Sequence, residues 1–84
     1  MNEKTVRALI AAGAIKNVRI IANGSTIYVE LDTVNGSFSA ETVKGKLKTW
    51  SSVNTAAKWV HSLGIGQALL DVSRWQPRQI GFRV

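Results

Sequence analysis

Apolar residues recur at two different spacings along this chain, and each spacing predicts a different kind of element. In the first segment Val6, Leu9 and Ile10 fall three or four residues apart, which is helical spacing. Asn2 can cap this helix, because its side chain can accept a hydrogen bond from the first turn, and Gly13 is a typical helix stop. The segment therefore predicts an amphipathic helix with one apolar stripe.

Two segments with alternation follow, the first interrupted by Ile21 and the second regular, and they are joined by a strong turn signal. Residues 16–23 and the residues from Thr26 to Asp32 both place apolar side chains at every second position. The dipeptide Asn23-Gly24 tolerates the positive φ angles of a type I′ turn, so the two segments predict a β-hairpin. The apolar positions are Val18, Ile20 and Ala22 in the first segment, and Ile27, Val29 and Leu31 in the second.

A second turn signal, Asn35-Gly36, opens a third segment that predicts one strand from Ser37 to Trp50. Period-two alternation then divides its later part between two faces, with Gly45 marking a bulge or a close backbone approach. One face carries Val43, Gly45 and Leu47, and the other carries Lys44, Lys46, Lys48 and Trp50.

The last third of the chain predicts a second helix and a short strand. Ser52 or Asn54 can cap the helix and Gly64 ends it, with a stripe at helical spacing between them. The stripe consists of Ala56, Trp59, Val60 and Leu63, where Trp59 is expected to belong to the core. A strand is predicted at 68–72, and the tail from Arg74 to Val84 either docks as an edge strand or frays.

The element order is therefore α-β-β-β-α-β, which predicts a single small α+β domain. A mostly antiparallel sheet of three to four strands carries the two helices on one face and leaves its other face partly exposed to water. The 84 residues suffice for one domain, predicted at residues 1–73, followed by a basic C-terminal tail at 74–84.

Composition narrows the class of protein. A content of 45% hydrophobic residues is typical of a globular chain, and no apolar run approaches the roughly 20 residues of a membrane-spanning helix. The absence of cysteine excludes disulfides and thiolate chemistry. We therefore expect a cytoplasmic protein without a membrane partner.

Candidate catalytic chemistry is sparse. His61 is the only histidine, so no site with several imidazole ligands can form, and its position favours an exposed place near a helix C-terminus. Glu30 and Asp32 share one face of a strand, where a solvated surface, paired with lysines of the neighbouring strand, is the simpler interpretation than an acid–base pair. The sequence predicts no enzyme, no catalytic residue, no metal site and no cofactor.

Charge gives the strongest functional signal. The net charge of +6 arises entirely after residue 43, because residues 1–43 carry equal numbers of acidic and basic side chains. On a regular strand, Lys44, Lys46 and Lys48 would stand about 7 Å apart, close to the spacing of phosphates along a nucleic-acid strand. Trp50 on the same face could stack on a base.

Two further observations bear on that interpretation. Arg74 and Arg78, on either side of Trp75-Gln76-Pro77, would extend the basic surface. Lysines on an exposed strand also protect sheets against edge-to-edge aggregation, and this alternative explains Lys44, Lys46 and Lys48 without a nucleic acid.

The stretch from Thr42 to Leu63 resembles a pattern in small plasmid- and prophage-borne accessory proteins, including ParC-type partition-associated proteins. Lys44, Gly45, Lys46, Lys48 and Trp50 match its basic and aromatic positions, and Asn54, Ala56, Ala57 and Trp59 match the helix that follows. The order of three strands and a helix is also similar to plant AP2 domains and integrase arm-binding domains, which place a sheet face in the major groove. This chain has fewer arginines on the sheet, and lysines make bidentate base contacts less readily.

These observations predict a small nucleic-acid-binding accessory protein of a mobile element, with DNA favoured over RNA as the partner. Binding would use Lys44, Lys46, Lys48, Trp50, Arg74 and Arg78. The alternative is a protein-interaction or homodimerisation module without catalytic activity, joined along a sheet edge or through the apolar positions of the tail, Ile80, Phe82 and Val84.

Overall fold

The two alternating segments form the longest hairpin of the protein. In the computed structural model, which describes residues 1–76, β1 (Ile15–Gly24) pairs antiparallel with β2 (Thr26–Thr33), and Asn23 lies opposite Thr26. The two loop residues are thus Gly24 and Ser25, and only Gly24 has a positive φ, of 63°. A positive φ at the first loop position alone is typical of a type II′ turn. The predicted type I′ turn at Asn23-Gly24 is therefore wrong by one residue.

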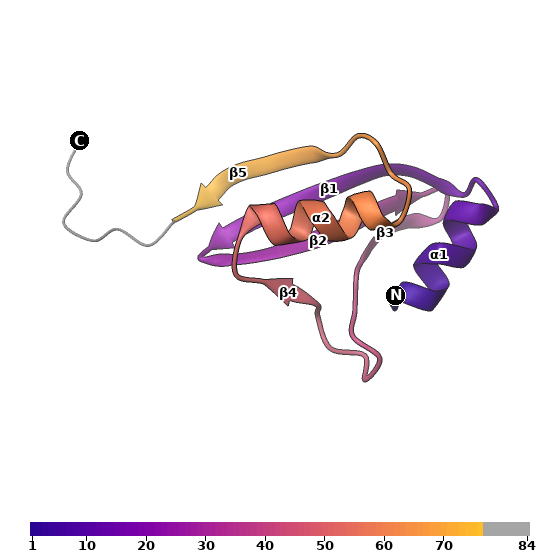
Figure 1. Ribbon diagram of the computed structural model, residues 1–84, viewed down its shortest axis with the longest axis horizontal. Helices are drawn as coiled ribbons and strands as arrows, with labels where there is room; N and C mark the ends of the chain where they lie inside the picture. The colour runs from indigo at the N-terminus through magenta and orange to yellow at the C-terminus, as the bar shows by residue number, and fades with distance from the viewer. Residues whose placement is uncertain (77–84) are drawn as a thin grey trace.

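The sheet has five strands and is mixed (Figure 1). β3 (Gly36–Ser39) pairs antiparallel with the end of β2, and β4 (Thr49–Trp50) pairs antiparallel with its beginning. β5 (Leu69–Trp75) lies on the other side, parallel to β1, which gives the order β3-β2-β1-β5. The predicted α+β class and α-β-β-β-α-β order are confirmed, with the third strand in two pieces. The sheet also continues through Arg74 and Trp75.

The prediction of one unbroken strand from Ser37 to Trp50 is wrong. β3 ends at Ser39 and β4 begins at Thr49, and between them the chain leaves the sheet after Ala40, whose N–H still donates to Val29 of β2 at 2.9 Å. Gly45 adopts a φ of 82°, outside the range of a regular strand, and its N–H closes a turn on the carbonyl of Thr42 at 2.9 Å. We call residues 40–48 the lysine finger.

Each helix begins at a capping side chain. α1 (Glu3–Ala11) is capped by Asn2, whose side-chain oxygen accepts the backbone N–H of Thr5 at 2.9 Å. α2 (Val53–Ser62) is capped in the same way by Ser52, and so the choice between Ser52 and Asn54 is settled in favour of Ser52. In the described part of the chain, neither helix combines the length and the apolar character needed to cross a bilayer.

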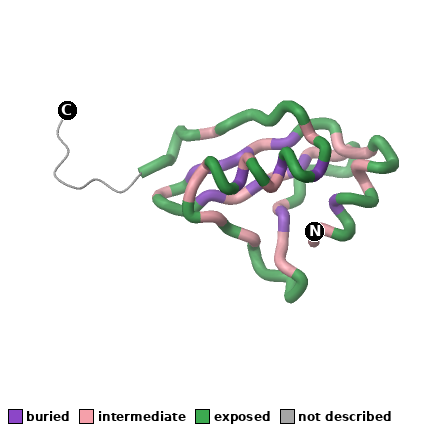
Figure 2. The backbone as a smooth tube through the Cα atoms, viewed as in Figure 1, coloured by how far each residue is buried: buried purple, intermediate pink, exposed green. Residues whose placement is uncertain are grey.

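One hydrophobic core joins both helices to the same face of the sheet. Figure 2 shows the buried positions concentrated in the central strands and on the side of α2 that faces them. The cluster contains Val6 of α1, Val18, Ile20 and Ala22 of β1, Ile27, Val29 and Leu31 of β2, Ala40, and Ala56, Val60 and Leu63 of α2 and its cap. The predicted arrangement of two helices on one face is confirmed, and the opposite, outer face is mostly polar, with buried Ile21 and its neighbour Tyr28 as exceptions.

Candidate nucleic-acid interface

Backbone hydrogen bonds hold the lysine finger in a narrow, two-legged shape. At its base the N–H of Lys48 donates to the carbonyl of Ala40 at 2.9 Å. Halfway along, the N–H of Thr42 donates to the carbonyl of Lys46 at 2.7 Å, and Thr42 Oγ1 accepts the N–H of Lys46 at 3.3 Å. The finger is thus a small hairpin that projects from the edge of the sheet.

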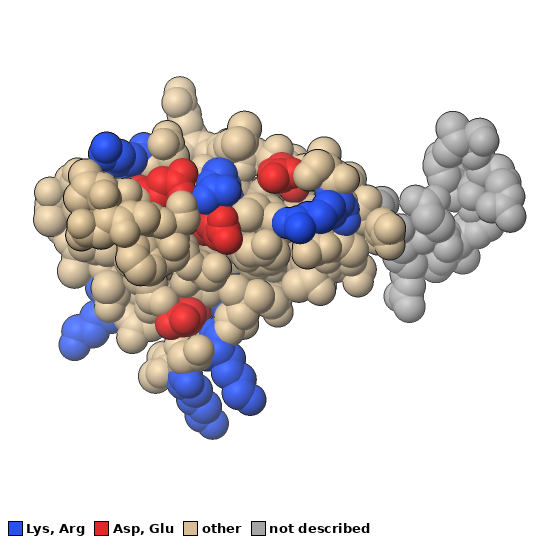
Figure 3. Space-filling model, turned by 180° about the vertical axis from the view of Figure 1, so that it is seen from behind, with Lys and Arg blue, Asp and Glu red and all other residues tan. Residues whose placement is uncertain are grey.

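The tip of the finger presents two lysines to solvent. Lys44 lies in the turn that the N–H of Gly45 closes on the carbonyl of Thr42 at 2.9 Å, and Lys46 begins the returning leg. Both lysines are exposed. In Figure 3 blue side chains extend from the lower end of the molecule, where Figure 1 places the finger. The straight lysine ladder predicted on a sheet face does not form, because these residues are outside the sheet.

Lys48 differs from the other two lysines because aromatic rings hold it against the domain. Its Nζ lies 5.6 Å from the ring centroid of Trp50 and 6.0 Å from that of Trp59. The two rings are 5.1 Å apart and tilted by 47°. Such cation–π contacts are favourable, and they fix the point at which the finger rejoins the sheet.

Trp50 lies on the face of the sheet that the helices cover. Its register partner in β2 is Ile27, which belongs to the core, so the indole points toward the helices. There it is half-buried against Trp59, and contact with the core explains this choice of face because it removes a large apolar ring from water. Trp50 thus shares its side of the chain with Lys48, as predicted, but not with the other two lysines of the finger, and its ring is not presented to solvent for stacking on a base.

A hydrogen bond from Trp59 extends the cluster to the first helix. Its Nε1 donates to Oε1 of Glu3 at 3.0 Å, and Oε2 of Glu3 accepts from Nε of Arg7 at 3.0 Å. The hydrogen bond from Trp59, followed by that from Arg7, lowers the pKa of the Glu3 carboxyl. The expected core role of Trp59 is thus only part of its function, since its polar edge joins α2 to α1.

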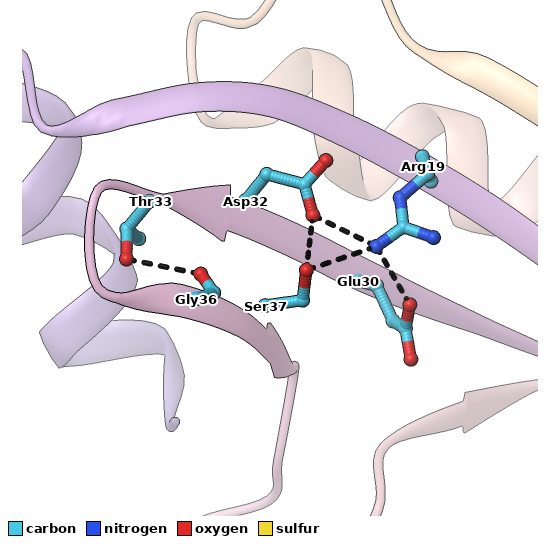
Figure 4. Close-up of polar contacts among 6 residues, drawn as sticks. All are labelled: Arg19, Glu30, Asp32, Thr33, Gly36 and Ser37. Atoms are coloured by element: carbon cyan, nitrogen blue, oxygen red, sulfur yellow. Dashed lines mark hydrogen bonds and ion pairs between the residues drawn. The ribbon is translucent and has the colours of Figure 1, made fainter.

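The outer face of the sheet carries a compact ionic network centred on Arg19 (Figure 4). Its Nη2 lies 2.7 Å from Oδ1 of Asp32 and 2.9 Å from Oε1 of Glu30, and Ser37 Oγ donates to the same Asp32 oxygen at 2.6 Å. The bond from Arg19, then that from Ser37, lowers the pKa of Asp32. Glu30 and Asp32 do share a face, as predicted, but they pair with this arginine and not with lysines.

The side-chain carboxylates of Asp and Glu, all five of which lie within residues 1–76, are occupied by groups other than lysine. The ion pairs within residues 1–76 use only Arg7, Arg19 and the amino group of Met1, which reaches Glu41 at 2.6 Å. The fifth carboxylate, that of Asp71, accepts from Ser73 N–H at 3.0 Å and Ser73 Oγ at 2.7 Å. The outer face accordingly shows red and blue side chains next to one another, whereas the blue side chains at the lower end of the molecule extend away from the red group at their base (Figure 3).

The remaining predicted residues do not gather at the finger. Arg74 is exposed on β5, at the opposite edge of the sheet, and Arg78 lies outside the described residues. His61 is exposed in the last turn of α2, as predicted. No group of three or more potential metal-ligating side chains occurs within residues 1–76. The structure therefore brings Lys44, Lys46 and Lys48 together and separates them from Arg74.

Sequence reasoning missed two parts of this surface. The aromatic support of Lys48 was hidden because Trp50 and Trp59 lie on different elements, and no local spacing predicts that their rings meet. The Arg19 network was hidden because it needs the register of three strands, although the equal charges of residues 1–43 were a weak signal of internal pairing.

Comparison with known proteins adds no relative: no protein-family description, no curated protein and no solved structure matches this chain significantly.

Proposed function

We propose that this protein is a small, non-enzymatic, cytoplasmic protein that binds nucleic acid electrostatically through the lysine finger. DNA is the favoured partner, and a role as an accessory factor of a plasmid or prophage is part of the proposal. The preference for DNA and the link to mobile elements rest on the resemblance of the segment from Thr42 to Leu63 to partition-associated proteins.

One observation carries the proposal: Lys44 and Lys46 form no ion pair within residues 1–76, because Glu41, the one carboxylate of the finger, is paired with the amino group of Met1. Lys44 and Lys46 are exposed on a projecting hairpin, and no ion pair of the described residues includes them. A lysine that contacts a phosphate releases condensed counterions from the nucleic acid, which favours binding most strongly at low salt. Protection of an edge strand explains the pair less well, because Lys44 and Lys46 belong to neither β3 nor β4.

The finger would read charge and not sequence. Lysine ammonium groups make point contacts to phosphates, whereas bidentate recognition of bases favours arginine, glutamine or asparagine. Trp50, half-buried against Trp59, serves in this proposal as a support for Lys48 and not as a platform for a base. Arg74 and Arg78 would extend the basic surface only for a nucleic acid long enough to reach the other edge.

The test is binding of a short labelled DNA duplex by fluorescence anisotropy at low and moderate salt. Changing Lys44→Glu together with Lys46→Glu should weaken binding at least about tenfold, because two phosphate contacts become repulsive. A matched control changes Lys16→Glu and Lys58→Glu, which are equally exposed and alter the net charge by the same amount away from the finger.

Three outcomes would contradict the proposal. The wild-type protein fails to bind, the control pair weakens binding as much as the finger pair, or binding survives the triple change of Lys44, Lys46 and Lys48 to glutamate. A single-stranded DNA and an RNA duplex of equal length, measured in parallel, test the preference for DNA.

A further inference from the structure

The two edges of the sheet are protected very differently. On one edge, β3 and β4 have four and two residues, and the lysine finger projects between them. On the other edge, β5 runs for seven residues, and within residues 1–76 no strand pairs with its outer side. Natural proteins protect such edges with short strands, charged side chains, prolines or β-bulges. The segment Leu69–Trp75 is long and contains neither lysine nor proline, and its two charged residues, Asp71 and Arg74, have opposite signs.

β5 also exposes apolar side chains. Their burial against a partner would be favourable in free energy. Half of the large hydrophobic residues that are exposed among residues 1–76 belong to this one strand. They are Leu69, Leu70, Val72 and Trp75, with exposed fractions of 63%, 45%, 45% and 42%. The side chains on the helix face are left uncovered because α2 packs over β1, β2 and β4. The strand therefore has both an open backbone edge and apolar surface beside it.

A bulge gives β5 an arrangement of side chains that is complementary to itself. Asp71 lies beside Ile21 of β1 and Arg74 lies beside Asn23, so three steps along β5 match two along β1. Asp71 and Arg74 consequently share the outer face, although an odd separation would place them on opposite faces of a regular strand. By the same register, Leu70 and Trp75 share the helix face.

We infer that two copies of this chain pair through β5, antiparallel, about a two-fold axis that passes between Val72 and Ser73 and is perpendicular to the sheet. This register sets Asp71 of each copy opposite Arg74 of the other on the outer face. On the helix face it sets Leu70 of each copy opposite Trp75 of the other. A register centred on Asp71 or on Arg74 would instead put like charges opposite each other, which is unfavourable.

The pairing closes with two-fold symmetry and gives one continuous sheet with all four helices on one face. The charge pairs fix the register, while the apolar contacts supply most of the affinity. The lysine fingers stay free, because they are on the opposite edges of the two copies (Figure 1). The pairing is independent of the proposed nucleic-acid binding, and only the oligomeric state tests it.

Sedimentation equilibrium of the full chain over a wide concentration range tests the pairing. The weight-average mass should rise with concentration from 9.1 kDa toward twice that value. Asp71→Arg and Arg74→Asp should each weaken association at least tenfold, because each places like charges opposite one another twice. The double variant, which exchanges the two charges, should restore it.

Lys58→Asp is the matched control for Arg74→Asp, since it makes the same change of charge on the exposed side of α2. Circular dichroism is used to check that each variant folds. If the single variants fail because the strand is damaged and not because like charges oppose each other, the double variant will not regain association. A mass that stays at one chain at every concentration would overturn the inference, as would occupation of the edge by residues 77–84 of the same chain. The register would be wrong if neither single variant weakened association. It would also be wrong if the double variant did not restore association.

Discussion

The ammonium group of Lys48 lies 5.6 Å from the ring centroid of Trp50, at the point where the lysine finger re-enters the sheet. Because the Trp50 ring packs on Trp59 of α2, this contact connects the finger to the helical layer. Trp59 in turn donates a hydrogen bond to Glu3 of α1. The base of the basic surface is thus built into the packing of both helices, whereas its tip, at Lys44, is free.

Removing the cation from this contact should cost a measurable amount of stability. We expect Lys48→Gln to lower the free energy of unfolding by about 0.5–1 kcal/mol, the usual range for a cation near an exposed or half-exposed ring. Lys58→Gln, which removes an exposed lysine of α2, should change it by less. Urea unfolding of the two variants makes the comparison, and equal effects would show that the rings do not stabilise Lys48.

The two tryptophans provide a matched pair for the hydrogen bond between the helices. Trp59→Phe removes the indole N–H that Glu3 accepts, whereas Trp50→Phe changes a ring whose N–H makes no hydrogen bond within the described residues. We expect Trp59→Phe to destabilise the protein more than Trp50→Phe, by about 1 kcal/mol, a typical net value for one hydrogen bond. Thermal or urea unfolding measures the difference, and an equal loss would contradict it.

Gly45 should resist substitution because of its backbone angle and not because of crowding. At its φ of 82° an added Cβ meets no atom within 4 Å, so Gly45→Ala tests conformation alone. We expect a loss of about 1–2 kcal/mol, the cost of the left-handed region for an L-residue. Gly66→Ala also meets open space but needs no positive φ, and it should be neutral or stabilising by up to about 1 kcal/mol. Unfolding curves that show equal effects would contradict the turn at the tip of the finger.

Acid should destabilise the protein through carboxylates whose pKa is lowered in the folded state. Hydrogen bonds lower the pKa of Glu3, through Trp59 first, and that of Asp32, through Arg19 first. In the unfolded chain these groups bind protons at higher pH, so their stabilisation is complete at neutral pH. It is lost as the pH falls below about 5 and through the folded-state pKa values.

Urea unfolding at a series of pH values should therefore give a constant free energy from pH 7 to about 5 and a decline below that. The double variant Glu3→Gln and Asp32→Asn should start from a lower stability at neutral pH and show a shallower decline. A variant with the same decline as the wild-type protein would mean that neither carboxyl is responsible.

The sequence was sufficient for the parts of the fold that local rules control. Alternation and a glycine turn predict the β1–β2 hairpin, because one face of both strands is buried under the helices. Side chains that bond to their own first turn predict the helix starts at Asn2 and Ser52. The position of the hairpin turn was off by one residue, since Asn23 and Gly24 both tolerate turn geometry and cross-strand packing chooses between the two registers.

The lysine finger could not be predicted because period-two alternation continues through it. Lys44, Lys46 and Lys48 fit a strand by spacing, but Thr42 and Gly45 close a turn that competes with pairing to β2. Because the strand was predicted to run through the finger, the side of the sheet on which Trp50 lies was not predicted either. It depends on where the chain re-enters the sheet, and this re-entry point is fixed by contacts with Trp59, nine residues further on.

The dependence of binding on salt tests the central claim most directly. For duplex DNA, the logarithm of the binding constant falls with the logarithm of salt concentration by about 0.9 for each phosphate contact. Replacing Lys44 and Lys46 with glutamine should therefore make the slope shallower by about 1.8, while replacing Lys16 and Lys58 with glutamine should leave it nearly unchanged. A slope that the finger variant shares with the wild-type protein would contradict the assignment of the lysine finger as the nucleic-acid interface.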